Sequence, residues 1–410
     1  GGLAGDALQD ADANVAVGTQ ALTRDTLGSK STAVGFNTLA DQNFTSATES
    51  FNTAMGYNAG GAVTTGTNNT FVGGLAGDAL TDADFNVGIG KNALGTNVLG
   101  SKSTAIGTFA LETQNPVDGS GNPTAVDMLN TAVGYYAGLS VTTGVQNTLI
   151  GAHAGDAITT GAANTAVGYL ALSLEDAHGY NTAVGHSALP VLNAGADGNN
   201  VAVGYYSGFT TSTGIDNTFL GTGAGGFCTT GDNNTFVGKH AGLGITGTKL
   251  TGNDNTAVGE NAGLLLQGAA NQNTLIGASA GDAITTGDNN TALGSGSGGA
   301  KTTGDEGVFL GYLAGNYSVG QATGQGNICL GSYSHTSATD GNYAVVIGYN
   351  VAGDAGYTTL GSGGDDIRAA HGNVTWATVS DQRYKKDIVD STAGLSFINA
   401  LQPRTFKYKT

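Results

Sequence analysis

The hydrophobic and polar positions of this chain repeat with a period near 17 residues. A five-residue phrase, Asn-Thr-Ala-Val-Gly in its commonest form, starts at Asn130, Asn164, Asn181 and Asn255, and related phrases recur along most of the sequence. The phrase ends in Gly 20 times, and 12 of the 19 intervals between these Gly are 17 residues. A fixed period of this length predicts a solenoid, in which each coil stacks on the next. These residues, the corner Gly of their coils, are Gly18, Gly35, Gly56, Gly73, Gly90, Gly107, Gly134, Gly151, Gly168, Gly185, Gly204, Gly221, Gly238, Gly259, Gly277, Gly294, Gly311, Gly331, Gly348 and Gly361.

The residues just before each corner Gly have the pattern of a short β-strand. The residue one position before it is Val, Ile, Leu or Met, and the residue three positions before it is Thr, Val or Ile. A spacing of two with β-branched residues is typical of a strand. The residue between them, such as Ala132, Leu149 or Phe219, is also apolar. Because successive side chains of a strand point to opposite faces, we expect both faces to be buried.

The two apolar faces decide between architectures. A coil of 17 residues can hold two short strands and two turns, and its interior can bury one face of each strand. We assign the Thr/Val and Val/Ile/Leu positions to the interior, and the Ala/Phe position to a surface that a neighbouring copy covers. This predicts an all-β solenoid of about 20 coils, associated side by side as a parallel homotrimer. The alternative is a monomeric solenoid with a helix or sheet over that face, and the sequence contains a pattern for neither.

Asn and Gly occupy fixed positions around the strand. The fourth residue before the corner Gly is Asn in 15 of the 20 copies. Stacked coils would bring these Asn into register about 4.8 Å apart, where their amides form a ladder from coil to coil. A ligand-binding role for the Asn is the alternative. The corner Gly are expected to provide positive φ or close approach of the backbone, and they form no phosphate loop because no helix follows them.

Composition and charge narrow the class of protein. The chain has 71 Gly in 410 residues but only four Pro and no triplet period, which excludes collagen. At 39% hydrophobic residues, disorder is not expected. No run of 18 apolar residues occurs, so we expect no membrane insertion. The net charge of −17 disfavours nucleic acid and anionic membrane surfaces as partners.

The charge is unevenly distributed, which suggests a change of module. Residues 1–364 carry 7 Lys and Arg against 26 Asp and Glu, whereas the last 46 residues carry 7 against 5. We therefore predict a β-solenoid shaft over residues 1–364, a junction over 365–379 and a short segment outside the solenoid over 380–410. Because the sequence has neither an initiator Met nor a signal peptide, we expect it to begin inside a longer chain.

Few residues suggest further chemistry on the shaft. Asp10, Asp12 and Asn14 have the spacing that begins a calcium loop, but the Gly and Glu of an EF-hand do not follow, so a solvated acidic turn is favoured. The six His show no paired metal spacing, and no metal or cofactor is predicted. No catalytic constellation can be assembled from the pattern. Cys228 and Cys329 lie about six coils apart, too far for a disulfide, and buried thiols are expected.

The repeat resembles known fibrous proteins over residues 1 to about 361. The Asn-Thr-Ala-Val-Gly phrase, followed by Ala-Gly and Thr-Thr-Gly, is similar to the left-handed β-roll heads of trimeric autotransporter adhesins. It is more similar to the repeat regions of phage tail fibres and of fibre-like bacterial surface proteins. The resemblance implies left-handed winding and a trimer.

The C-terminus resembles the start of the intramolecular chaperone domain of endosialidases, tail spikes and tail fibres. The matching residues are Ser380, Asp381, Arg383, Lys385, Ile388, Gly394, Leu395, Ile398, Leu401, Pro403 and Tyr408. The resemblance implies that the domain trimerises the fibre and then cuts itself off just before Ser380, with Ser380 as nucleophile and Lys385 as base. Only 31 residues remain from Ser380 onward, so either the sequence is truncated or the domain is vestigial. The alternative is a capping segment in which Ser380 caps a turn.

Three functions follow as hypotheses. The first is the structural shaft of a trimeric phage tail fibre, located on the virion or outside cells, that presents a surface to a host receptor or glycan. The second is a bacterial cell-surface or secreted adhesin or filament. The third is that one self-cleavage before Ser380 is the only enzymatic activity. A trimerising chaperone suits the repeat, because near-identical coils offer many wrong registers.

Overall fold

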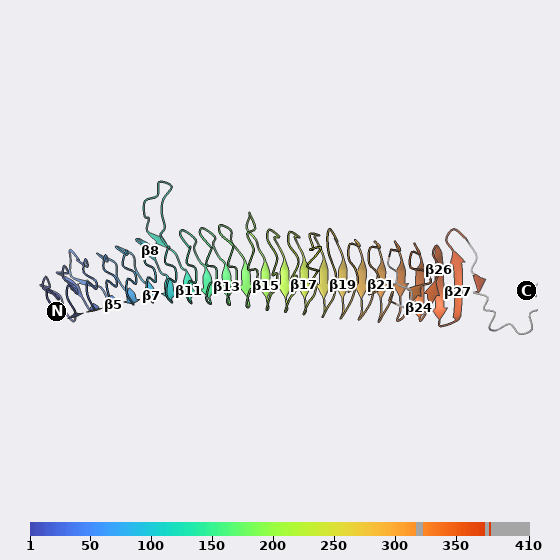
Figure 1. The fold of residues 1–410 in the computed structure, drawn as a ribbon, viewed down its shortest axis with the longest axis horizontal. Helices are drawn as coiled ribbons and strands as arrows, with labels where there is room; N and C mark the ends of the chain where they lie inside the picture. Colours follow the sequence, from blue (N-terminus) through green and yellow to red (C-terminus); the bar gives the residue numbers. More distant parts are fainter. Residues whose placement is uncertain (317–322, 374–376, 379–410) are drawn as a thin grey trace, which may run out of the picture.

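The protein is a long rod of stacked coils (Figure 1). The computed structural model describes residues 1–316, 323–373 and 377–378. Within these ranges the chain is all-β and contains no helix. It forms a parallel β-solenoid of about 20 turns with about 17 residues per coil, which confirms the predicted all-β solenoid and its number of coils, while left-handed winding and the trimer stay predictions.

One short strand per coil builds a single sheet along the rod. Strands of the same three positions stack side by side from one end to the other (Figure 1). The strands of this sheet are β1 (Val15–Val17), β3 (Thr32–Val34), β5 (Thr53–Met55), β6 (Thr70–Val72), β7 (Val87–Ile89), β9 (Thr104–Ile106), β11 (Thr131–Val133), β12 (Thr148–Ile150), β13 (Thr165–Val167), β14 (Thr182–Val184), β15 (Val201–Val203), β16 (Thr218–Leu220), β17 (Thr235–Val237), β18 (Thr256–Val258), β19 (Thr274–Ile276), β20 (Thr291–Leu293), β21 (Val308–Leu310), β22 (Ile328–Leu330), β24 (Val345–Tyr349), β26 (Tyr357–Ser362), β27 (Asp365–Ala370) and β28 (Ala377–Thr378).

The register of the sheet follows the sequence repeat. In β11 and β12, Ala132 pairs with Leu149, and the neighbouring columns pair in the same way. The 27-residue interval between β9 and β11 leaves this register unchanged, since Ala105 still pairs with Ala132. Its extra residues form the loop that projects from the rod near β8 (Gly100–Ser101) in Figure 1. Insertions therefore extend the surface and leave the sheet intact.

The expected second strand in each coil is not formed. Among the described residues, the only further strand pairs are β2 (Gly28–Ser29) with β4 (Thr48–Glu49), β8 with β10 (Val126–Asp127), and β23 (His335–Thr336) with β25 (Ala352–Gly353). The rest of each coil is a series of turns whose backbone groups still bond to the next coil. For example, the Gly60 amide donates to the Ala76 carbonyl at 2.9 Å.

The strand faces are the reverse of those we predicted. The Ala/Phe column points into its own coil, where Ala132 and Phe219 are fully buried. The column before the corner Gly points outward, and Leu220 is 46% exposed. The reason is that alternate side chains of a strand point to the same face. The Asn four residues before the corner Gly is buried, so the residue two positions before the corner Gly points inward with it. The interior is narrow, which suits Ala better than Val or Ile.

Two facing columns share the volume of the interior. Where the strand carries Phe or Leu, the residue four positions after the corner Gly is Gly. A Cβ on Gly225 would lie 2.5 Å from Cδ1 of Phe219, so the ring occupies that space. Where the later position is a buried Leu, as at Leu94, the strand residue is Ala or Gly, here Gly88. Such coils thus place one large side chain between two opposing columns. Other coils carry a small residue in both columns, as at Ala132 and Gly138, and side chains of neighbouring coils, here Leu111 and Leu149, occupy the space.

Gly is required at the corners for the two expected reasons, positive φ and close approach of the backbone. Gly151 has φ of 134°, which side-chain-bearing residues rarely adopt. A Cβ on Gly151 would also lie 2.5 Å from the carbonyl oxygen of Gly168 in the next coil. The backbones of adjacent coils therefore approach closely at these corners.

The parallel ladder ends near residue 362. Strand β26 pairs parallel with β24 on one side and antiparallel with β27 on the other, and β27 pairs antiparallel with β28. The predicted boundaries at 364 and 379 stay a prediction, since the last 32 residues lie outside the described part of the chain.

Candidate functional site

The outer face of the sheet carries an unbroken aliphatic stripe. We define the stripe as the residue before each corner Gly, from Val17 to Leu360; every member is Val, Ile, Leu or Met. Most are exposed or half-buried, and Val17 and Leu293 are 55% and 47% exposed. The column beside it, three residues before the corner Gly, is Thr, Val or Ile throughout, so no charge interrupts the face. A contiguous apolar surface that runs the length of a rod is typical of an interaction surface.

The Asn column forms the predicted ladder. The side chain of Asn217 is buried, and its Oδ1 accepts the backbone amide of Asn234 at 2.9 Å. Its Nδ2 donates to the Gly231 carbonyl at 2.8 Å. The bonds therefore run mainly from amide side chain to backbone of the next coil, with additional amide-to-amide bonds such as that from Asn273 to Asn255 at 3.0 Å. Because the side chains are buried and bonded, the ligand-binding alternative for this column is wrong.

Acidic residues of the shaft form a second ladder at its surface. The Oδ1 of Asp232 accepts the backbone amide of Ile215 in the preceding coil at 2.9 Å. Asp288 accepts the Asn271 amide in the same way at 2.7 Å. Asp84, which with Asp82 and Asn86 repeats the spacing of Asp10, Asp12 and Asn14, accepts the Thr67 amide at 2.6 Å. This Asp thus bonds one coil to the next, a role that sequence reasoning missed.

Polar side chains also occupy the interior, which the sequence did not predict. Asp25 is fully buried, and its Oδ1 accepts the Gly28 amide at 3.0 Å while its Oδ2 accepts Nε2 of Gln42 at 2.5 Å. Asn97 repeats the turn contact with Gly100 at 2.9 Å. The recurring phrase Gly-Ser-Lys-Ser-Thr-Ala after these residues was the available signal. These networks satisfy turn amides and thereby hold the coils together.

Lys301 is the one buried lysine among the described residues. Its Nζ donates to the Gly324 carbonyl at 2.7 Å and lies 5.5 Å from the ring centroid of Phe309. Burial lowers the pKa of Lys301 to about 8, although nearby Asp305 opposes the shift. A buried amine of this kind needs a structural reason.

The reason is a gap in the Asn ladder. Gly307 stands where the coil would carry its ladder Asn. In a regular coil the ladder Asn donates to the carbonyl that lies on the next coil, as Asn290 does to Gly304 at 3.0 Å. Lys301 donates to the corresponding carbonyl of Gly324 and so replaces the missing amide.

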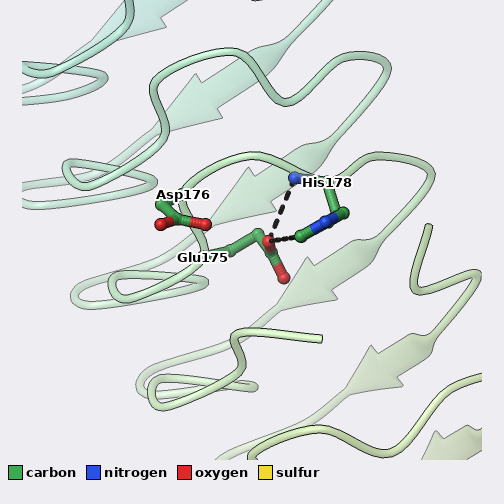
Figure 2. Close-up of side chains that lie close together, drawn as sticks. All are labelled: Glu175, Asp176 and His178. Atoms are coloured by element: carbon green, nitrogen blue, oxygen red, sulfur yellow. Dashed lines mark hydrogen bonds and ion pairs between the residues drawn. The ribbon is translucent and has the colours of Figure 1, made fainter. Parts of the chain in front are cut away.

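One cluster contains the residue types of a metal site. Ligand atoms of Glu175, Asp176 and His178 lie within 4.8 Å of one another, the one such group found among the described residues. Figure 2 shows the carboxylate of Glu175 turned toward His178, away from Asp176. Its Oε1 is 3.2 Å from both the backbone nitrogen and Nδ1 of His178, and its Oε2 accepts the Ala194 amide at 3.3 Å. These hydrogen bonds satisfy the buried carboxylate of Glu175, whose role is to close a turn.

The two cysteines are buried and form no disulfide, as expected. Burial raises the pKa of the Cys228 thiol to about 12, because desolvation disfavours the thiolate, so this thiol is protonated and unreactive at neutral pH. In the inward column, Cys329 lies beside Phe309 of one neighbouring strand and Val346 of the other. The outward placement of this column, which would have brought Cys329 toward a neighbouring copy, is therefore wrong.

The predicted cleavage residues Ser380 and Lys385 lie outside the described residues. Residues 380–410 match a protein family described as chaperone of endosialidase. That family implies trimer assembly, and together with the solenoid the match fits a fibre-like repeat protein with the start of a chaperone domain. Comparison with curated proteins and with solved structures found no match. Within the described ranges, no helix is long and apolar enough to cross a membrane.

Proposed function

We propose that the protein is the shaft of a trimeric, extracellular fibre of the phage tail-fibre type, which presents a surface to a host receptor. The observation that carries this proposal is the aliphatic stripe, because it leaves a row of apolar side chains in water along the whole sheet. The match of residues 380–410 to a chaperone family that assembles trimers supplies the partner, namely two further copies of the chain.

The stripe provides the contact between chains. Adjacent coils present an aliphatic side chain about every 4.8 Å, so two parallel copies in the same register match each other rung by rung. Left-handed winding of each chain is part of the proposal and rests on the resemblance of the repeat to β-roll heads. The absence of charge from both outward columns removes the main cost of burying the face.

A C-terminal chaperone solves a register problem. Because the coils are nearly identical, a shift by one coil would still match apolar side chains with apolar side chains. A trimeric seed at residues 380–410 fixes the height at which the three chains start. We further propose that the Ser380 hydroxyl then attacks the carbonyl of the preceding peptide bond while Lys385 takes the hydroxyl proton. The peptide bond breaks as the Ser380 nitrogen is protonated and leaves as an amine, which forms an ester, and water hydrolyses this ester to release the shaft.

The substitution Leu220→Lys, which introduces a charge on the stripe, tests the proposed interface. Leu220 is 46% exposed on the stripe, so the single chain tolerates the change, whereas a trimer would bury three ammonium groups beside one another. We expect sedimentation velocity to show trimers for the unmodified chain and single chains or partly separated trimers for the variant. The matched control is Asp216→Lys, four residues earlier on the same coil and off the stripe, which should remain trimeric. Equal sedimentation of all three proteins would contradict the interface.

A further inference from the structure

A row of aromatic rings runs along the rod just beyond the corner Gly. We define the aromatic ladder as Tyr135, His153, Tyr169, His186 and Tyr205, one residue from each of five consecutive coils. Successive ring centroids lie 5.7, 6.4, 5.2 and 5.5 Å apart. The three Tyr are 47 to 49% exposed, so their rings remain open to solvent. Stacked coils therefore convert single aromatic residues into a continuous surface.

The ladder ends in a pocket of about 140 Å³. Its walls include Tyr205, Tyr206 and Phe209 from one coil and His240 from the coil two turns further on. The coil between them carries Gly223 where its neighbours carry Tyr206 and His240, and this missing side chain opens the pocket. A Cβ on Gly223 would lie 2.8 Å from Cδ2 of His240.

The size and lining of the pocket suit one six-membered ring. A cavity of roughly 150 Å³ accommodates benzene, so this one has space for a single ring. The lining is mainly apolar and aromatic, and four of its residues carry a hydroxyl or an imidazole: Tyr205, Tyr206, Thr222 and His240. A pyranose has the complementary surface, because its C–H face stacks on an aromatic ring and its hydroxyls bond at the rim.

Charge favours a neutral ligand. No Lys or Arg lines the pocket, and the shaft of residues 1–364 carries far more acidic than basic residues. An anionic sugar would be repelled by that field. Successive rungs of the ladder lie 5.2 to 6.4 Å apart along five coils, so the ladder can contact several units of one oligosaccharide.

We propose that the pocket at Gly223 and the aromatic ladder together form a binding site for a neutral oligosaccharide. The inference rests on the proposed function, for which it names the receptor class and the binding surface. The site lies after the corner Gly, whereas the stripe lies before it, so binding and trimer assembly use different columns of the coil. Three copies in one fibre would add avidity to weak single sites.

The test is a printed array of neutral and acidic glycans, followed by calorimetric titration with the neutral oligosaccharide that binds best. The test variant is Gly223→Asn, which fills the pocket. Asn is compatible with the backbone there, since Asn261 occupies the same position of its coil with φ of 58° and Gly223 has φ of 65°. The control is Ser279→Asn, which introduces the same side chain at the same coil position outside the ladder, where φ is 54°.

We expect the unmodified chain to bind neutral glycans, Gly223→Asn to weaken binding at least tenfold, and Ser279→Asn to leave it unchanged. The inference is overturned if no neutral glycan binds, if only acidic glycans bind, or if Gly223→Asn binds as well as the unmodified chain. Light scattering on the same samples separates the two proposals. A trimer without glycan binding contradicts this inference alone, whereas glycan binding by a single chain contradicts the trimeric fibre alone.

Discussion

At the scale of the residue, a coil with one large interior side chain divides its interior volume between two columns. Phe219 on the strand faces Gly225, and other coils place Leu at the later position opposite Ala or Gly. Leu is accepted there although the backbone is left-handed, as Leu94 shows with φ of 56°. Volume, more than backbone preference, therefore decides which residue a coil carries at this position.

This exchange predicts that two harmful substitutions compensate each other. Phe219→Ala leaves a cavity and should lower the free energy of unfolding by about 3–5 kcal/mol. Gly225→Leu places its side chain in the space of the Phe219 ring and should destabilise the coil as well. The double variant recreates the Ala/Leu pairing of other coils, so urea unfolding should show most of the stability restored. If the two losses simply add, the volume argument fails.

The columns were predictable from the sequence at this scale, but their direction was not. Both columns of the strand are apolar, so hydrophobicity alone did not decide which of Phe219 and Leu220 faces inward. The deciding residue is polar: Asn217 is buried by its bonds to the next coil, and period two then places Phe219 beside it. Sequence reasoning placed these Asn at a turn and did not use their face.

At the scale of the element, the ladders hold the coils together where no strand forms. Most coils lack a second strand, and residues after the corner Gly adopt positive φ even without being Gly, as at Tyr136 with φ of 59° and Leu172 with φ of 52°. Sequence patterns seldom reveal left-handed conformations of such residues. Side-chain ladders of Asn and Asp supply the bonds between coils instead.

The ladder gap at Gly307 gives a prediction about pH. Because the folded pKa of Lys301 is about 8 and its usual value is 10.5, the unfolded chain binds more protons between these values. The stability contributed here should therefore rise as the pH increases from about 8 to 10.5. Urea unfolding at several pH values measures this rise, and Lys301→Ile should remove it.

Restoring the ladder provides the control. Lys301→Ile alone leaves the Gly324 carbonyl unbonded and should cost about 1–3 kcal/mol. Adding Gly307→Asn recreates a regular coil with Asn two residues before Phe309. The coil of Asn217 and Phe219 has the same pair of residues, and both side chains are buried there. The double variant should recover stability and show no pH dependence in this range. Failure to recover would mean that Lys301 does not replace the ladder amide.

At the scale of the whole molecule, the period predicted the solenoid and the number of coils, because stacking follows directly from self-similarity. The sequence of a single coil does not indicate how many chains assemble. The aliphatic stripe leaves an apolar face exposed, and we propose that two further copies of the chain cover it, a proposal that the chaperone match of residues 380–410 supports. The reversal of the faces keeps the argument for a trimer but moves the contact from the Ala/Phe column to the stripe.

The proposed self-cleavage is tested by Ser380→Ala. Removing the hydroxyl should leave the chain uncut, whereas the unmodified chain should lose the residues from Ser380 onward. Intact-mass spectrometry of both proteins after purification measures the difference, and Lys385→Met should resemble Ser380→Ala if the amine acts as base. The same mass for the unmodified chain and both variants would contradict self-cleavage and leave a chaperone that only assembles the trimer.

The most direct test of the trimeric fibre is the mass of the unmodified assembly by light scattering, before and after boiling in detergent. The chain has a mass of 40.5 kDa. Burial of the aliphatic stripe between three chains predicts three times this mass in the native sample and one chain only after boiling. A single-chain mass in the native sample would contradict the account, because the stripe would then be a stable surface in water and the chaperone would have no trimer to assemble.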